Sequence, residues 1–100
     1  MIRAGFRKDD SGKNIGFTVS NHGDSKVCAA VSALAINCVN SLEELVGADI
    51  YVDASPDGGK LICDVAKPNS KALLLLDSLE LGLRAIEAEY PRQIRISEVN

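Results

Sequence analysis

One short segment of the chain contains a histidine and a cysteine, two residue types that together can form a nucleophilic pair. His22 is the only histidine in the sequence, and Cys28 follows it after five intervening residues. Cys28 falls in the first turn of an expected helix, where the partial positive charge of the helix N-terminus favours a thiolate, and an imidazole can accept the thiol proton. We therefore predict that His22 and Cys28 form the dyad of a cysteine hydrolase.

Residues around Cys28 could support this chemistry. Lys26 adds positive charge, and Ser32 lies one helical turn after Cys28, so its hydroxyl can face the same site. Asp24 could orient the imidazole, and it could equally cap the helix. In the predicted reaction the protonated imidazole gives its proton to the leaving amine, while backbone N–H groups around Cys28 and Ala29 hold the oxyanion.

The same residues also have an ordinary structural interpretation. Cys28 can be a small residue at the start of a helix and His22 a polar loop residue, because His-x-x-x-x-x-Cys is not a specific pattern. The other two cysteines, Cys38 and Cys63, fall on expected inward faces, which predicts buried and unreactive thiols. The sequence has no closely spaced cysteine pair and no second histidine. We therefore expect no metal site and no cofactor.

Five strands and two helices are needed to position these residues. Alternation of apolar and polar residues predicts strands, and apolar spacings of three and four predict helices. The expected strands lie at residues 2–7, 15–20, 49–53, 60–65 and 93–99, and the helices at 26–46 and about 70–90. Nearly every strand has one apolar and one polar face. This indicates an α+β fold of order ββαββαβ, with two helices packed on one face of a single mixed sheet.

Each predicted helix has an apolar stripe for the core. The first stripe consists of Val27, Val31, Leu34, Cys38, Leu42 and Leu45, and the second of Ala72, Leu76, Leu79, Leu83, Ile86 and Tyr90. Asp24 or Ser25 can cap the first helix, Gly47 can end it, and Asn69 or Ser70 can cap the second. Leu74 and Leu81 point away from the second stripe, with Ala85 and Ala88 nearby, which suggests a homodimer contact.

Composition limits the partners and the compartment. The 100 residues predict one domain over 1–100, with a 46% hydrophobic and 25% charged composition typical of a soluble globular protein. The net charge of −3 disfavours nucleic acid and suits a basic protein or peptide. We see no charged-then-apolar leader and no run of about eighteen apolar residues, so we expect neither a signal peptide nor a membrane span. Three cysteines suggest reduced thiols and a cytoplasmic protein.

The chain resembles the Prp family of ribosomal-processing cysteine proteases in the run Val27-Cys28-Ala29-Ala30-Val31-Ser32-Ala33-Leu34, which a histidine precedes. The likeness extends over the whole chain through length, element order and the Tyr-Pro before the last strand. It implies that His22 and Cys28 are the catalytic dyad and that Ser32 supports the cysteine helix. It also implies a small α+β sandwich that dimerises. The implied substrate is large-subunit ribosomal protein number twenty-seven, from which the family enzyme removes a short N-terminal extension.

Two features differ from the usual family pattern. The family's Gly-His-Ala reads Asn21-His22-Gly23 here. The segment between His22 and Cys28 is also shorter than the glycine-rich loop of long-loop members, so the resemblance is to a short-loop member.

The sequence is consistent with three hypotheses for the function. The leading hypothesis is a cytoplasmic cysteine endopeptidase that acts on a ribosomal protein precursor. The alternative is a non-catalytic module of the same fold that binds a ribosomal or other peptide. A third hypothesis, an RNA- or ribosome-associated factor, is disfavoured by the acidic net charge.

Overall fold

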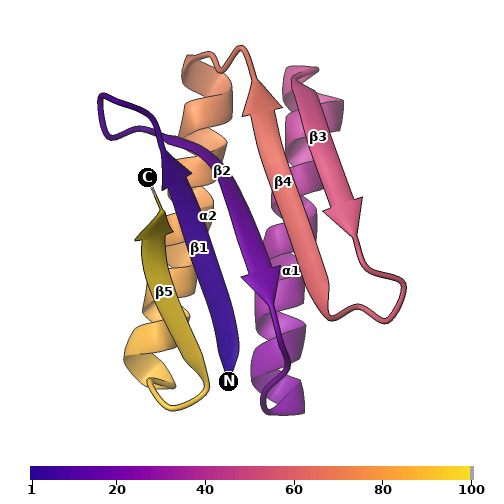
Figure 1. Cartoon of the computed structure of the whole chain (residues 1–100), viewed down its shortest axis with the longest axis vertical. Helices are drawn as coiled ribbons and strands as arrows, with labels where there is room; N and C mark the ends of the chain where they lie inside the picture. Colours follow the sequence, from indigo (N-terminus) through magenta and orange to yellow (C-terminus); the bar gives the residue numbers. More distant parts are fainter. Residues whose placement is uncertain (100) are drawn as a thin grey trace.

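The computed structural model describes residues 1–99 and has a five-stranded sheet with two long helices behind it (Figure 1). The elements in chain order are β1 (Ile2–Lys8), β2 (Asn14–Ser20), α1 (Ser25–Ser41), η1 (Leu42–Val46), β3 (Asp49–Ala54), β4 (Lys60–Ala66), α2 (Ser70–Glu89) and β5 (Ile94–Val99). The strands are arranged as β3-β4-β2-β1-β5. β1 and β5 are parallel, and the other neighbours are antiparallel. The predicted α+β fold and ββαββαβ order are confirmed.

Both helices cover the same face of the sheet. α2 lies behind the half that contains β5 and β1, and α1 lies behind the half that contains β4 and β3 (Figure 1). The buried apolar side chains of the strands are Ile2, Ala4, Phe6, Phe17, Cys63, Val65, Ile94 and Ile96. They alternate along β1, β4 and β5 as the sequence predicted, whereas β3 has no buried residue and Val52 is 40% exposed. Burial of these apolar side chains against the two helices supplies the main stabilisation of the fold.

Local signals set the helix ends. Asp24 accepts a hydrogen bond from the backbone N–H of Lys26 and caps α1, and Asn69 accepts one from Ala72 and caps α2. Gly47 ends the first helical segment in the left-handed conformation, with φ of 66°. The last turn before Gly47, η1, is π-helical rather than α-helical. The predicted helix at 26–46 is therefore observed as an α-helix followed by one wider turn.

The predicted core stripe of the first helix is wrong at two leucines. Leu34 is 36% exposed and Leu45 is 78% exposed, whereas Ala35 and Val39 are buried. Leu45 lies in η1, where the wider turn changes its direction from that of an α-helical residue. Leu34 lies beside α2, where a Cβ on Gly82 would be only 2.9 Å from its Cδ1. The face of α1 in the core is therefore the one that contains Ala35 and Val39.

The end of α2 also differs from the prediction. The helix ends at Glu89, and Tyr90, which was placed on the core stripe, is the C-cap residue and is 36% exposed. Ile86 is partly buried against the core. The rest of the predicted α2 stripe is buried.

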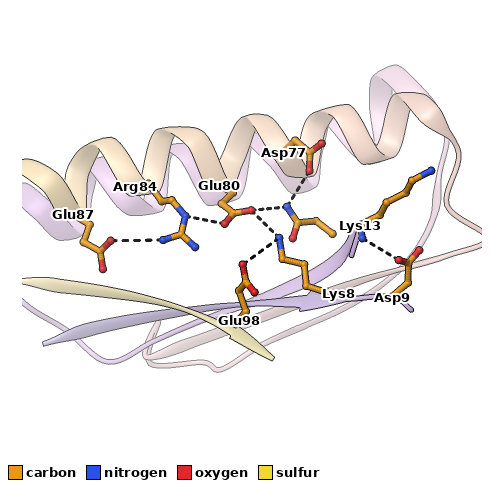
Figure 2. Close-up of polar contacts among 9 residues, drawn as sticks. Lys8, Asp9, Lys13, Asp77, Glu80, Arg84, Glu87 and Glu98 are labelled. Carbon is orange, nitrogen blue, oxygen red and sulfur yellow. Dashed lines mark hydrogen bonds and ion pairs between the residues drawn. The ribbon is translucent and has the colours of Figure 1, made fainter. Parts of the chain in front are cut away.

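A polar cluster joins α2 to the β1–β2 hairpin, at the end of the sheet far from the start of α1 (Figures 1 and 2). The Lys8 ammonium lies 3.1 Å from the Glu80 carboxylate and 3.9 Å from that of Glu98. Glu80 also accepts hydrogen bonds from Asn14 and Arg84. Burial alone raises the pKa of Glu80, but the hydrogen bonds from Asn14, Lys8 and Arg84 outweigh it and lower the pKa.

One helical segment has the length and composition of a membrane-spanning helix. It is Ser25–Val46, with a mean hydropathy of 1.3 over its most apolar window, of which 39% is buried. The core helix of a soluble protein has the same properties, and α1 contributes six buried residues to the fold. Packing on the sheet therefore accounts for the apolar composition, and the segment is weak support for a membrane span.

Candidate active site

The segment between β2 and α1 is held by backbone hydrogen bonds. The N–H of Asn21 donates to the carbonyl of Gly59 in the β3–β4 turn, with an N···O distance of 2.9 Å. Asn21 has a φ of 71°, a left-handed conformation that asparagine tolerates better than most residues. At the other end, the N–H of Cys28 donates to the carbonyl of Asp24 over 2.8 Å. The segment from His22 to Cys28 is thus a short loop that leads into the first turn of α1, with hydrogen bonds that hold the backbone at both ends.

The Cys28 sulfur is half-buried beside the loop backbone. The N–H of Gly23 donates to Cys28 Sγ over 3.2 Å, and the Gly23 carbonyl oxygen lies 3.7 Å from the same sulfur. The Gly23 N–H is a donor to this sulfur, and the Gly23 carbonyl is an acceptor for the Cys28 thiol. The backbone of the loop therefore contacts the Cys28 sulfur through both polar groups of Gly23.

A cavity of about 250 Å³ opens beside the sulfur. His22, Cys28 and Ser32 all contribute to its lining, so the structure brings three of the four predicted site residues to one place. The remaining walls come from β1, β2, α1 and the β3–β4 hairpin, and include Ile2, Val19, Ile36, Ser55, Gly59 and Leu61. The mixture of an apolar wall with a few polar groups is typical of a ligand-binding cleft.

The fourth predicted residue, Asp24, is the cap of α1. Its Oδ1 accepts from the N–H of Lys26 over 3.0 Å, which is the capping role that the sequence left open. Asp24 is not among the residues of the cavity wall. The structure thus assigns Asp24 to the helix end, one step removed from the cavity.

The histidine lies near a different carboxylate. Asp57 in the β3–β4 turn accepts hydrogen bonds from the Gly59 N–H and the Ser55 hydroxyl. These bonds, with a smaller effect from the positive charge of His22, hold the pKa of Asp57 below its usual range. Within residues 1–99, no hydrogen bond joins the His22 ring to the Cys28 sulfur. The ring and the sulfur share a cavity without a direct bond in this state.

The other two thiols are buried, as predicted. Burial raises the pKa of Cys38 to about 11, and burial with the nearby Cys38 and Asp64 raises the pKa of Cys63 to about 12. Both thiols are therefore overwhelmingly protonated at neutral pH. Cys28 is the one cysteine of the three that is not buried.

One of the expected oxyanion donors already has a hydrogen-bond partner. The sequence analysis assigned oxyanion binding to backbone N–H groups around Cys28 and Ala29. The Cys28 N–H is already bonded to the Asp24 carbonyl, because that bond closes the first turn of the helix. A different backbone N–H, that of Gly23, donates to the Cys28 sulfur.

The sequence analysis missed Gln93 and the β3–β4 turn. Gln93 Oε1 accepts from the N–H of Asp24 over 2.8 Å, although 69 positions separate the two residues in the chain. Gly58 and Gly59 line the cavity but were interpreted only as turn residues. No local pattern could have found either contact, because both arise from the order of strands in the sheet. Among residues 1–99, no group of three His, Cys, Asp or Glu residues could hold a metal ion.

A reachable thiol at the start of a helix, in a cavity shared with a histidine, is the arrangement found in cysteine proteases, and this class of enzyme fits the fold and the site. The family described as Cysteine protease Prp matches residues 1–95, and the chain belongs to that family. The chain is thus a cysteine protease of the ribosomal processing type.

Relatives and solved structures agree along almost the whole chain. The ribosomal processing cysteine protease Prp of Bacillus subtilis (strain 168) is 27% identical over 108 residues, which cover 97% of this chain and 96% of that protein. The corresponding Staphylococcus aureus (strain Mu50) protein is 29% identical over 104 residues, covering 97% and 98%. The crystal structure of the S. aureus protease with a covalently linked product peptide is 27% identical, with a TM-score of 0.94 and coverage of 99% and 100%. The same enzyme with a substrate peptide is 25% identical, with a TM-score of 0.92 and the same coverage.

Proposed function

We propose that this chain is an endopeptidase that removes the N-terminal extension of large-subunit ribosomal protein number twenty-seven, through a dyad of His22 and Cys28. The observation that carries the proposal is the shared cavity, which both residues line, and Cys28 is the one cysteine of the three that is not buried. The relatives named as ribosomal processing proteases, one of them solved with a substrate peptide, support a ribosomal precursor as the substrate.

In this proposal His22 accepts the Cys28 proton and the thiolate attacks the carbonyl carbon of the scissile peptide bond. The tetrahedral intermediate collapses, and His22 gives the proton to the leaving amine. Water, deprotonated by the same imidazole, then releases the new carboxylate from the thioester. No metal or cofactor takes part. Ser32, which is exposed in the same cavity, is placed to contact the bound peptide.

The alternative is a peptide-binding module without turnover. It is favoured by one observation, that the sulfur is bonded to the Gly23 backbone and not to the His22 ring. Both hypotheses use the same cavity, but only the protease requires a rotation of the exposed His22 side chain toward the sulfur. Both hypotheses therefore predict peptide binding at the same place, and only the protease hypothesis predicts a cleaved product.

The experiment is to incubate the purified protein with the ribosomal precursor from the same organism and to measure the product mass. We expect a precursor shortened at its N-terminus, with no shortening by Cys28→Ser or His22→Ala. Cys63→Ser, which changes a buried thiol far from solvent, is the matched control and should still cut. Binding of the intact precursor without cleavage by the wild type would support the alternative.

We also propose that the protein acts in the cytoplasm and as a homodimer that uses the exposed side of α2. Leu74 is 68% exposed and Leu81 is 75% exposed, one heptad apart on the helix. A second copy of the chain could cover these leucines, with Ala85 and Ala88 allowing close approach.

A further inference from the structure

The face of the sheet that neither helix covers carries a row of positively charged side chains. Both helices lie behind the sheet in Figure 1, so the front of that view is this open face. The strand registers pair Arg3 of β1 with Arg95 of β5 and with Ser20 of β2. Ser20 in turn pairs with Lys60 of β4. The four residues therefore form one line across β5, β1, β2 and β4, which we call the cationic row.

Alternation along the strands places the cationic row on the open face. Arg3 and Arg95 each lie between two residues that are buried against the helices. Lys60 directly precedes Leu61, which packs against the core from the covered face. Because successive side chains of a strand point to opposite faces, Arg3, Arg95 and Lys60 point away from the helices. Ser20 is the direct cross-strand neighbour of two of them and so shares their face.

The carboxylates of the sheet leave this row positively charged. Among residues 1–99, no ion pair includes a cation of the row. The strands place three carboxylates on the open face, those of Asp49, Asp53 and Asp64. Asp64 is paired with Arg7, and the other two lie on the edge strand β3. Positive charge is therefore concentrated over β5, β1 and β2 and the start of β4, although the net charge of the chain is −3.

Hydroxyl groups lie in the row and directly beside it. Ser20 belongs to the row, and the next line of the open face consists of Ser97, Gly5 and Thr18, which the registers place side by side. The Thr18 oxygen accepts a hydrogen bond from Arg7 over 2.7 Å, so its hydroxyl proton remains available to donate. The open face thus offers hydroxyl donors and acceptors next to the cations.

These features fit the backbone of a nucleic acid better than a membrane or a protein surface. Cationic and hydroxyl side chains contact phosphate and sugar rather than base edges. Stable membrane binding adds inserted apolar side chains to the charge, and protein interfaces are anchored by buried aromatic or aliphatic residues. Among residues 1–99, none of the exposed large apolar side chains lies in β1, β2, β4 or β5. With about 4.8 Å between neighbouring strands, the row is about 14 Å long and suits an extended chain of phosphates.

We propose that this open face binds the sugar–phosphate backbone of single-stranded RNA, with Arg3, Lys60 and Arg95 on phosphates and the neighbouring hydroxyls on the ribose 2′-OH groups. The 2′-OH is the group by which a protein distinguishes RNA from DNA. Net charge alone predicted no nucleic acid partner, because the sum conceals the separation of charge between faces. Lys60 also lines the cavity, so the RNA surface lies beside the protease site. This inference goes beyond the proposed function and does not depend on it.

The test is fluorescence anisotropy of a fluorescein-labelled oligouridine strand, titrated with the whole protein at several KCl concentrations. Three phosphate contacts predict a slope of about −2 in log affinity against log salt, which is an affinity loss of about twentyfold between about 50 and 200 mM KCl. Arg3→Ala and Arg95→Ala should each weaken binding and make the slope shallower by about 0.7, because each removes one contact. Lys71→Ala is the matched control and should keep the wild-type slope, since Lys71 is exposed at the start of α2 behind the sheet.

The two arginines lie on different strands, so either variant is sufficient if the other folds poorly. Binding that does not depend on salt, or a wild-type slope in the folded arginine variants, would overturn the proposal. Equal binding of oligothymidine, of polyglutamate or of vesicles that contain phosphatidylserine would also overturn it, because the face would then not select RNA. If the protein leaves the ribosomal precursor intact but binds oligouridine with the expected slope, the protease proposal fails and the RNA surface stands. Cleavage of the precursor without oligouridine binding is the reverse result.

Discussion

At the scale of single residues, the three cysteines are distinguished by burial and by one hydrogen bond. Cys38 and Cys63 have little or no contact with solvent, and their pKa values of about 11 and about 12 leave only a minute fraction as thiolate at neutral pH. Cys28 is reached by solvent and accepts the Gly23 N–H. The position of a cysteine in the fold, and not its residue type, decides which thiol can react.

This difference predicts the pattern of chemical modification. At pH 7 we expect iodoacetamide to label Cys28 more than about a hundredfold faster than Cys38 or Cys63, because only the thiolate reacts. His22→Ala should slow the labelling of Cys28 by removing the nearby base, with no effect on the two buried thiols. Mass spectrometry of peptides after timed quenching measures all three rates. Equal and slow labelling of the three cysteines would contradict a nucleophilic role for Cys28.

How much of the site could be predicted depends on the distance in sequence. His22, Cys28 and Ser32 lie within eleven residues of one another. The helix period places Ser32 on the same side as Cys28, and His22 lies in the short loop directly before this helix. The contact of Gln93 with Asp24 depends on the pairing of β1 with β5, which no local pattern specifies. The alternation of residues identified the strands and, except in β3, their inward faces, but it contains no information about which strands are neighbours.

At the scale of elements, periodicity was sufficient for type and order but not for the last turns of the helices. The π-helical turn η1 and the early end of α2 both fall where backbone geometry departs from the regular period. Leu45 and Tyr90 were assigned to the core because a regular helix would have continued to bring them there. The close packing of Leu34 against Gly82 of the other helix was likewise not predictable, because the apolar stripe of one helix does not show where a second helix lies.

The polar cluster that joins α2 to the β1–β2 hairpin predicts a pH-dependent stability. Folding lowers the pKa of Glu80 below its usual value of 4.5. The ionised carboxylate therefore stabilises the folded protein fully at pH above 4.5, and this stabilisation is lost as the pH falls through the lower pKa of the folded state. Glu80→Gln should lower the free energy of unfolding at pH 7 by about 1–3 kcal/mol, because Lys8 loses its closer partner. Urea denaturation measures this loss.

The same denaturation experiment at low pH tests whether the Glu80 charge is the source of the stabilisation. The gap in stability between the wild type and Glu80→Gln should narrow as the pH is lowered below about 4. Glu89→Gln is the matched control, since Glu89 is exposed on the same helix, and its effect should be small at both pH values. A gap that stays constant with pH would show that the Glu80 charge is not the source of the stabilisation.

At the scale of the whole molecule, the order of strands determines where the chemistry lies. The loop after β2, the β3–β4 turn and the turn before β5 are far apart in sequence, and the order β3-β4-β2-β1-β5 brings all three to the end of the sheet where α1 begins (Figure 1). The polar cluster that secures α2 is at the opposite end (Figure 2). Changes that weaken the cluster should therefore lower stability with little effect on the cavity around Cys28.

The exposed side of α2 predicts the assembly of the molecule. Leu74 and Leu81 leave an apolar strip on a surface that does not contribute to the cavity, so a second copy can cover it while the site stays open. We expect the wild type to sediment as a dimer and Leu81→Lys as a monomer, because the substitution places a charge in the covered strip. Leu45→Lys is the matched control: Leu45 is 78% exposed at the end of the other helix, and its variant should remain dimeric. A wild type that is monomeric at every concentration tested, or a Leu81→Lys variant that sediments unchanged, would exclude this face as the contact.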